Sequence, residues 1–162
     1  VANPYRVSEG RLWYSWQYLD VFRKFITVKM LAKGILTVED ALKCIEHGID
    51  GIVVSNHGGR SLDYGPSSLE VLPAIIDAVK GRVPVLVDSG FRRGTDIMKA
   101  LAIGANGVCM GRAARWGLGS FGPEGVQRVF EILQSELVSA MAGAGKPNLA
   151  SLDRSAIRMR FT

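Results

Sequence analysis

The sequence predicts an α/β fold in which parallel strands alternate with helices, and three observations support this prediction. Short apolar runs, such as residues 51–55, alternate with longer segments whose apolar residues recur at helical spacing, such as residues 67–80. This unit of strand and helix occurs four times in series, which is typical of parallel strands joined by right-handed crossovers. Polar side chains follow the end of each predicted strand, where parallel sheets commonly place functional groups.

Length and composition indicate one globular domain. The chain has 162 residues, enough to bury a sizeable core, and 48% of them are hydrophobic. We therefore expect a single domain over residues 1–162, with a loop or frayed start over 1–11 and a C-terminal tail over 145–162. The net charge of +5 is spread along the chain rather than gathered in one run, which argues against nucleic acid as a partner.

Cysteine usage and hydropathy favour a reduced, cytoplasmic protein. Cys44 falls in a helical pattern and Cys109 in an apolar run, so we expect both to be core thiols without a disulfide. No apolar run is long enough for a membrane span, and a peripheral position at the inner membrane face is an alternative that no feature supports. No pair of histidines or cysteines has metal-ligand spacing, so no metal is expected. The chain begins with Val1 rather than Met, and we expect a further part upstream.

The first half of the chain contains three predicted elements. Residues 12–25 form an amphipathic helix, because apolar side chains recur along them at helical spacing. A strand is expected over 28–33. A helix follows over 38–47, with Thr37 as its N-cap and Gly48 as its C-cap.

The remaining elements repeat the same form. We expect strands over 51–55, 84–88 and 107–110, helices over 67–80 and 95–103, and, after the last strand, a short helical turn over 113–117 and a long helix over 122–142. An open, doubly wound sheet of four strands would fit this order. Four units are also half of an eightfold barrel, in which case residues 12–25 are the helix that follows the fourth strand.

Polar residues and a glycine stand at the carboxyl ends of the predicted strands. In chain order they are Lys33, Ser55 with His57, Asp88, and Gly111 with Arg112. Parallel strands would bring all four sets to one rim. His57 is the natural proton acceptor there, since the unperturbed pKa of imidazole lies near neutrality. Arg60 can form two hydrogen bonds with a carboxylate, and the glycines between these two residues let the backbone bend.

The last two strand ends suggest a phosphate site. The stretch 88–94, Asp-Ser-Gly-Phe-Arg-Arg-Gly, and the pair Gly111-Arg112 stand where barrels hold phosphate on the loops after strands seven and eight. Backbone N–H groups at Gly90 and Gly111, with an arginine, suit a phosphate dianion. One of Arg92 and Arg93 could be a surface charge, but two cations beside a helix N-terminus are unfavourable without an anion. No Walker loop and no G-x-G-x-x-G follow any strand, which disfavours a nucleoside triphosphate and a Rossmann-bound nicotinamide.

Five stretches together resemble one enzyme family. They are Lys33-Gly34-Ile35-Leu36, Ser55-Asn56-His57-Gly58-Gly59-Arg60 with Leu62-Asp63, Asp88-Ser89-Gly90-Phe91-Arg92-Arg93-Gly94, Lys99 to Ala105, and Met110-Gly111-Arg112. They are similar to motifs of the FMN-dependent 2-hydroxy acid oxidases and dehydrogenases, which include glycolate oxidase, flavin-type L-lactate dehydrogenase and mandelate dehydrogenase. The resemblance covers roughly residues 16–160. It implies the C-terminal half, strands 5–8 with their helices, of a (βα)8 TIM barrel.

The resemblance also implies an activity: oxidation of an (S)-2-hydroxy acid to the 2-oxo acid with FMN. His57 would be the proton acceptor and would contact the substrate, and Arg60 would bind the substrate carboxylate. Lys33 would lie at the N1 and O2 edge of the flavin. The other cofactor-binding residues would be Ser55, Asp88, Ser89, Gly90, Phe91, Arg92, Gly111 and Arg112.

The partners implied are a small 2-hydroxy acid, the N-terminal half of the same barrel and further copies in a homotetramer or larger assembly. The family's other substrate-binding groups belong to that N-terminal half, so we expect this chain not to function alone. Arg154, Arg158 and Arg160 in the tail would lie on a neighbouring subunit or in solvent. Two alternatives remain, another FMN-binding or phosphate-binding barrel enzyme and a non-catalytic half-barrel. The identity of the hydroxy acid and of the electron acceptor stays open.

Overall fold

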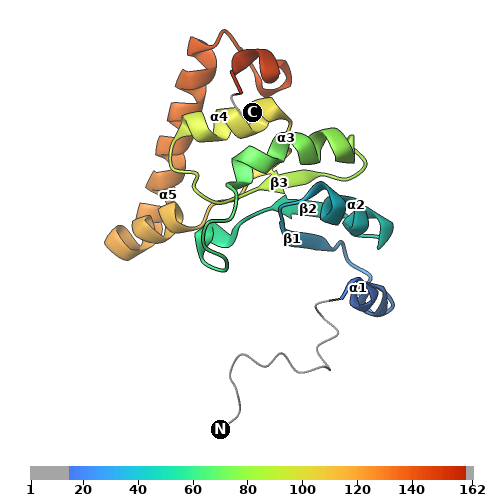
Figure 1. The fold of residues 1–162 in the computed structure, drawn as a ribbon. Coiled ribbons are helices and arrows are strands. Elements are labelled where there is room, and N and C mark those ends of the chain that lie inside the picture. Colours follow the sequence, from blue (N-terminus) through green and yellow to red (C-terminus); the bar gives the residue numbers. More distant parts are fainter. Residues whose placement is uncertain (1–14, 160–162) are drawn as a thin grey trace.

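The computed structural model describes residues 15–159 and contains a parallel sheet of four strands (Figure 1). The strands are β1 (Leu31–Ile35), β2 (Gly51–Val54), β3 (Val85–Val87) and β4 (Gly107–Val108), and they neighbour each other in chain order. A doubly wound sheet reverses its strand order at a switch point, whereas consecutive strands of a barrel stay in order. The observed order therefore favours the half-barrel over the open doubly wound sheet.

In the described part of the chain, five α-helices accompany the sheet: α1 (Trp16–Arg23), α2 (Val38–Glu46), α3 (Ser68–Val79), α4 (Gly94–Ile103) and α5 (Arg112–Gly143). Figure 1 shows α2, α3 and α4 side by side along the sheet. The main core fills the space between them, and Ile52, Val54, Val85 and Val87 are its fully buried strand residues. On the other face of the sheet, Leu31 remains 51% exposed.

Side-chain caps explain where α2 and α3 begin. The Thr37 hydroxyl oxygen accepts a hydrogen bond from the Asp40 N–H at 3.1 Å, as the sequence predicted. Ser67 caps α3 in the same way, through the N–H of Glu70 at 3.2 Å. Gly48 follows the end of α2 with a φ of +72°, a conformation that glycine adopts without steric cost.

The first strand begins later than the sequence predicted, at Leu31 rather than residue 28. Asp50 accounts for the difference, because its carboxylate accepts the Met30 N–H at 2.9 Å and pairs with Arg23 and Lys29, both at 2.9 Å. These contacts, led by the Met30 hydrogen bond, lower the pKa of Asp50 to about 2. The residues before Leu31 are thus held in a charged cluster outside the sheet.

Helix α5 joins the two helices expected after the last strand, and it is broken between them. Phe121 leaves helical geometry with a φ of −143°, and Gly122 has a φ of +64° directly before Pro123. The two segments pack closely, since a Cβ on Gly117 would overlap the carbonyl of Gly125. The first turn of α5 also includes Arg112, one residue earlier than expected.

The two ends of the chain are described in part. The predicted helix over 12–25 is present as Trp16–Arg23, while the expected loop over 1–11 and Arg160 lie outside the described residues. The tail contains two short 3-10 turns, Leu149–Ser151 and Arg154–Ala156.

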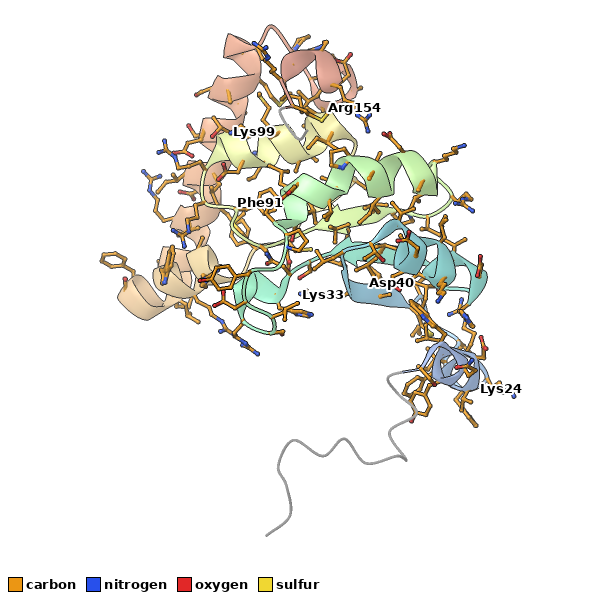
Figure 2. All side chains as sticks on the ribbon, in the orientation of Figure 1. Lys24, Lys33, Asp40, Phe91, Lys99 and Arg154 are labelled. Atoms are coloured by element: carbon orange, nitrogen blue, oxygen red, sulfur yellow. The ribbon has the colours of Figure 1, made fainter. Side chains whose placement is uncertain are left out.

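Arg154 of the tail contacts residues of its own chain. Its guanidinium pairs with Asp77 of α3 at 2.7 Å and donates to the Ile103 carbonyl at 3.2 Å, so it anchors the tail to its own chain (Figure 2). No helix within residues 15–159 has the length and hydropathy needed to cross a membrane.

Candidate functional site

A cavity of about 400 Å³ opens at the carboxyl ends of the strands. Its wall contains Lys33 of β1 and residues that follow β2, β3 and β4, and it includes every predicted site residue except Ser55. The lining consists of Lys33, His57, Gly58, Arg60, Asp88, Ser89, Gly90, Phe91, Arg92, Cys109, Met110, Gly111, Arg112, Ala113 and Arg115. The structure thus brings together groups that are up to 82 positions apart in the sequence, from Lys33 to Arg115.

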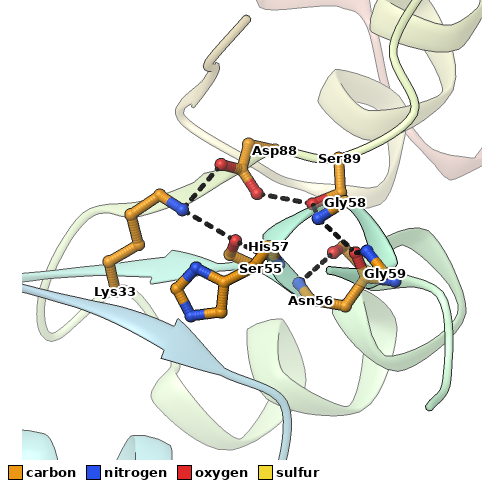
Figure 3. A network of polar contacts seen from close by, with 9 residues as sticks. Lys33, Ser55, Asn56, His57, Gly58, Gly59, Asp88 and Ser89 are labelled. Atoms are coloured by element: carbon orange, nitrogen blue, oxygen red, sulfur yellow. Dashed lines mark hydrogen bonds and ion pairs between the residues drawn. The ribbon is translucent and has the colours of Figure 1, made fainter. Parts of the chain in front are cut away.

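A polar network fixes the ammonium of Lys33, which lines the cavity (Figure 3). Its Nζ atom donates to Ser55 Oγ at 2.9 Å and pairs with Asp88 Oδ2 at 2.9 Å, while Ser89 Oγ donates to Asp88 Oδ1 at 2.8 Å. Burial alone would raise the pKa of Asp88, but the hydrogen bonds and the charge of Lys33 lower it on balance. Ser55 is fully buried and serves this network from beneath the cavity.

The turn that carries His57 is held by side-chain oxygens. Asn56 Oδ1 accepts the N–H groups of Gly58 and Gly59 at 3.0 and 3.2 Å, and Ser89 Oγ also accepts the Gly58 N–H at 3.0 Å. His57 itself has a φ of +56°, a left-handed conformation that is unusual for a residue with a side chain. Strained backbone of this kind is common at functional sites.

The imidazole of His57 lies against β1 at a position where only glycine leaves room. The register of β1 against β2 shifts between Lys33 and Ile35, and Gly34 lies in this irregularity with a φ of +100°. A Cβ on Gly34 would be 2.8 Å from His57 Nε2. Lys33 therefore does not end its strand, as the sequence suggested, but stands beside a bulge that makes space for the imidazole.

Arg60 follows the same turn and lines the same cavity. It is exposed, and within residues 15–159 its guanidinium forms no hydrogen bond or ion pair. An imidazole and a guanidinium on one turn, the latter without a partner among residues 15–159, suit an acidic substrate that loses a proton.

Arginines gather at the other side of the cavity. Arg112 Nη2 donates to the Gly58 carbonyl at 3.2 Å, and the Arg92 guanidinium lies 5.0 Å from the ring centroid of Trp116. Gly90 and Gly111 border this region, and a Cβ on either would meet no atom within 4 Å. The backbone is therefore open to a ligand at both glycines.

The structure separates the roles of the two adjacent arginines that the sequence could not assign. Arg93 Nε donates to both carboxylate oxygens of Glu136, at 2.8 and 3.0 Å, and does not line the cavity. Arg92 does line it. Asp96 accepts the backbone N–H groups of both arginines and so fixes the start of α4.

Two further residues refine the predicted set. Phe91 borders the cavity, but it is only 7% exposed and packs in the main core. Arg115 was missed by sequence reasoning, although it lines the cavity. Its position three residues after Arg112, on one face of a helix, is the signal that could have identified it.

Comparisons with known proteins agree with one another. The family model described as FMN-dependent dehydrogenase matches residues 6–159. The peroxisomal (S)-2-hydroxyacid oxidase GLO3 of Arabidopsis thaliana is 47% identical over 90% of this chain and 40% of its own length. Human 2-hydroxyacid oxidase 1 is 46% identical over 89% of this chain and 39% of its own length.

Solved structures agree with the sequence relatives. The structure of the monotopic membrane protein (S)-mandelate dehydrogenase is 43% identical, with a TM-score of 0.86, over 90% of this chain and 38% of that chain. The chain spans about two fifths of the length of the relatives it matches. Its four units correspond to part of the TIM barrel of such flavoenzymes, which confirms the predicted fold class. With a family model that matches nearly all of its length, the chain belongs to the FMN-dependent dehydrogenase family.

Proposed function

We propose that this chain, completed by the rest of a (βα)8 barrel, binds FMN and oxidises an (S)-2-hydroxy acid to the 2-oxo acid. One observation carries the proposal: His57 and Arg60 meet the fixed ammonium of Lys33 and a group of arginines in one cavity. Membership of an FMN-dependent family and relatives named as 2-hydroxyacid oxidases support the same reaction.

The residues present fit FMN. A cavity of about 400 Å³ is within the range of about 300 to 1,000 Å³ that is typical of ligand sites. Arg92 and Arg112, with the open backbone at Gly90 and Gly111, would hold the phosphate dianion. Lys33 would provide a fixed positive charge beside the flavin ring, where negative charge gathers on reduction. When bound, FMN supplies the oxidising group that accepts the two electrons lost by the substrate.

His57 and Arg60 would act on the substrate directly. Arg60 binds the carboxylate through two parallel hydrogen bonds, which orients the 2-hydroxy group. His57 then accepts a proton from the substrate, either from the hydroxyl oxygen or from the carbon that carries it, and both routes require the same base. Gly34 of β1 leaves the room that the imidazole occupies, since a Cβ there would lie 2.8 Å from His57 Nε2.

Substitution of His57 by Gln tests the assignment. We expect the H57Q protein to retain bound flavin but to lose rapid flavin reduction by 2-hydroxy acids, which is followed as bleaching of the flavin absorbance. His47, the other histidine of the chain, pairs with Asp20 in a different part of the structure and provides the control, His47→Gln. Rapid reduction in H57Q, at the rate of the unchanged protein, would refute the role of His57.

Substitution of Arg60 by Lys tests the carboxylate site. A lysine keeps the charge but loses the two-pronged geometry, so KM should rise more than kcat falls. Equal steady-state constants for Arg60→Lys and the unchanged protein would contradict this role.

We further propose that the remaining four units of the barrel are this chain's obligatory partner. The edges of β1 and β4 carry backbone groups that are not paired within the four-stranded sheet, and Leu31 remains exposed on one face of that sheet. We expect the completed barrel to assemble as a homotetramer or larger. A stable, flavin-free monomer of 17.6 kDa in size-exclusion chromatography with mass analysis would contradict the proposal.

The proposed location is the cytoplasm, with attachment to the inner membrane face as the alternative. Relatives differ in this respect, since one is named peroxisomal and another is described as a monotopic membrane protein. Two free cysteines support a reducing compartment. Recovery of the native protein in the membrane fraction after cell lysis would favour the alternative.

A further inference from the structure

The charges that line the cavity exceed what FMN and a hydroxy acid need. Among the residues that the structure describes, five cationic side chains line it, those of Lys33, Arg60, Arg92, Arg112 and Arg115, and Asp88 is the one acidic residue. Lys33 pairs with Asp88 at 2.9 Å and is assigned to the flavin ring, so it is not counted toward the phosphate. With Arg60 assigned to the substrate carboxylate, three guanidinium groups remain for one phosphate.

These three guanidinium groups gather at the first turn of α5. Arg112 and Arg115 are three residues apart on this helix and so share a face. Arg92 comes from the end of β3, but its guanidinium lies over the ring of Trp116, the residue next to Arg115. The stacking contact therefore draws Arg92 to the same turn.

No acidic side chain of the described residues pairs with Arg115. The guanidinium of Arg115 forms no hydrogen bond or ion pair within residues 15–159. Asp96 instead accepts the backbone N–H groups of Arg92 and Arg93, and Glu136 pairs with the Arg93 side chain. Three like charges beside the positive end of a helix repel one another, and a bound dianion relieves that repulsion.

We propose that Arg115 is a third guanidinium of the phosphate site and makes the protein select the phosphorylated flavin over riboflavin. The inference rests on the proposed function. It adds to the phosphate contacts of Arg92 and Arg112 a residue that the family motif does not contain. Arg115 would place a full positive charge beside a phosphate of charge near −2. Its contribution to the free energy of binding therefore depends on the phosphate and not on the flavin ring.

The experiment compares two ligands that differ only in the phosphate. The assembled protein, stripped of flavin, is titrated with FMN and separately with riboflavin, and the quenching of flavin fluorescence gives each Kd. In Arg115→Gln we expect the Kd for FMN to rise by about 10-fold or more, the effect of losing one charge-assisted hydrogen bond. The Kd for riboflavin should stay the same, and the salt dependence of FMN binding should become shallower.

Two controls separate the outcomes. Arg128 lies on the same helix, pairs with Glu131 at 3.2 Å and does not line the cavity, so Arg128→Gln should change neither Kd. An unaltered ratio of the two Kd values in Arg115→Gln would overturn the inference, and so would an equal rise in both, which would indicate a structural role. If the unchanged protein fails to prefer FMN over riboflavin, the proposed function fails and the inference fails with it.

Discussion

Replacing Gly34 by Ala would test whether β1 positions the imidazole of His57. Alanine at a φ of +100° costs about 1 to 2 kcal/mol of backbone strain. The added methyl would also lie 2.8 Å from His57 Nε2, closer than the 3.0 Å that Cβ contacts respect, so the ring must move by a few tenths of an ångström. A displacement of 1 Å costs about 100-fold in rate, and we therefore expect flavin reduction to slow by about 10-fold.

Two measurements separate the backbone strain at residue 34 from the displacement of the His57 ring. Urea unfolding of the assembled protein measures the loss of stability, and stopped-flow absorbance measures flavin reduction by a 2-hydroxy acid. Gly81 provides the matched control, because its φ is +70° but no atom lies within 4 Å of a Cβ built there. Gly81→Ala should lose similar stability without slowing flavin reduction.

A double-mutant cycle isolates the contact between residue 34 and the ring of His57. In a His57→Ala background, Gly34→Ala keeps its backbone strain but loses the clash with the ring, so its cost in stability should be smaller than in the unchanged protein. Flavin reduction in Gly34→Ala at the rate of the unchanged protein would refute the reasoning.

Three further predictions concern acid stability, thiol reactivity and helix capping. The pKa of Asp88 is lowered in the folded state, so its stabilisation is present above the ordinary carboxyl pKa of about 3.9 and is lost as the pH falls through the folded value. Asp88→Asn should therefore flatten the decline in unfolding free energy between about pH 5 and about pH 2, and an equally steep decline would contradict this role. Burial, and secondarily the charge of Asp40, raises the pKa of the Cys44 thiol to about 11, leaving about one thiolate in a thousand at pH 8. Mass spectrometry after iodoacetamide treatment should find Cys109 labelled in the folded protein and Cys44 only after unfolding, and early labelling of Cys44 would argue against this burial. Thr37→Ala removes the acceptor of the Asp40 N–H and should lower the unfolding free energy by about 1 kcal/mol in urea titrations, with flavin reduction unchanged.

The sequence predicted the order of elements and the shared rim because both depend on local pattern. The apolar run at 51–54 has the composition of a strand buried on both faces, and the structure buries all four residues. Thr37 and Gly48 bound a helix by capping rules that operate over a few residues. Once the strands are parallel, topology alone brings the ends of all four to one edge.

Contacts between distant residues set the features that the sequence could not predict. The start of β1 depends on Asp50, which is 20 residues away from the Met30 N–H that it binds. The choice between Arg92 and Arg93 depends on Glu136 and Trp116, both on α5. The cofactor itself came from resemblance to a family, since spacing indicates an anion site but not a flavin.

The hydrogen bond from Arg112 to the Gly58 carbonyl changes how variants at position 112 should be interpreted. Gly58 is the residue after His57, so the guanidinium of the proposed phosphate site also braces the turn that carries the proposed base. A loss of turnover in such a variant combines weaker cofactor retention with a loosened imidazole. Saturating the variant with FMN would restore cofactor occupancy but would not restore the position of the imidazole. A single titration with FMN therefore separates the two effects.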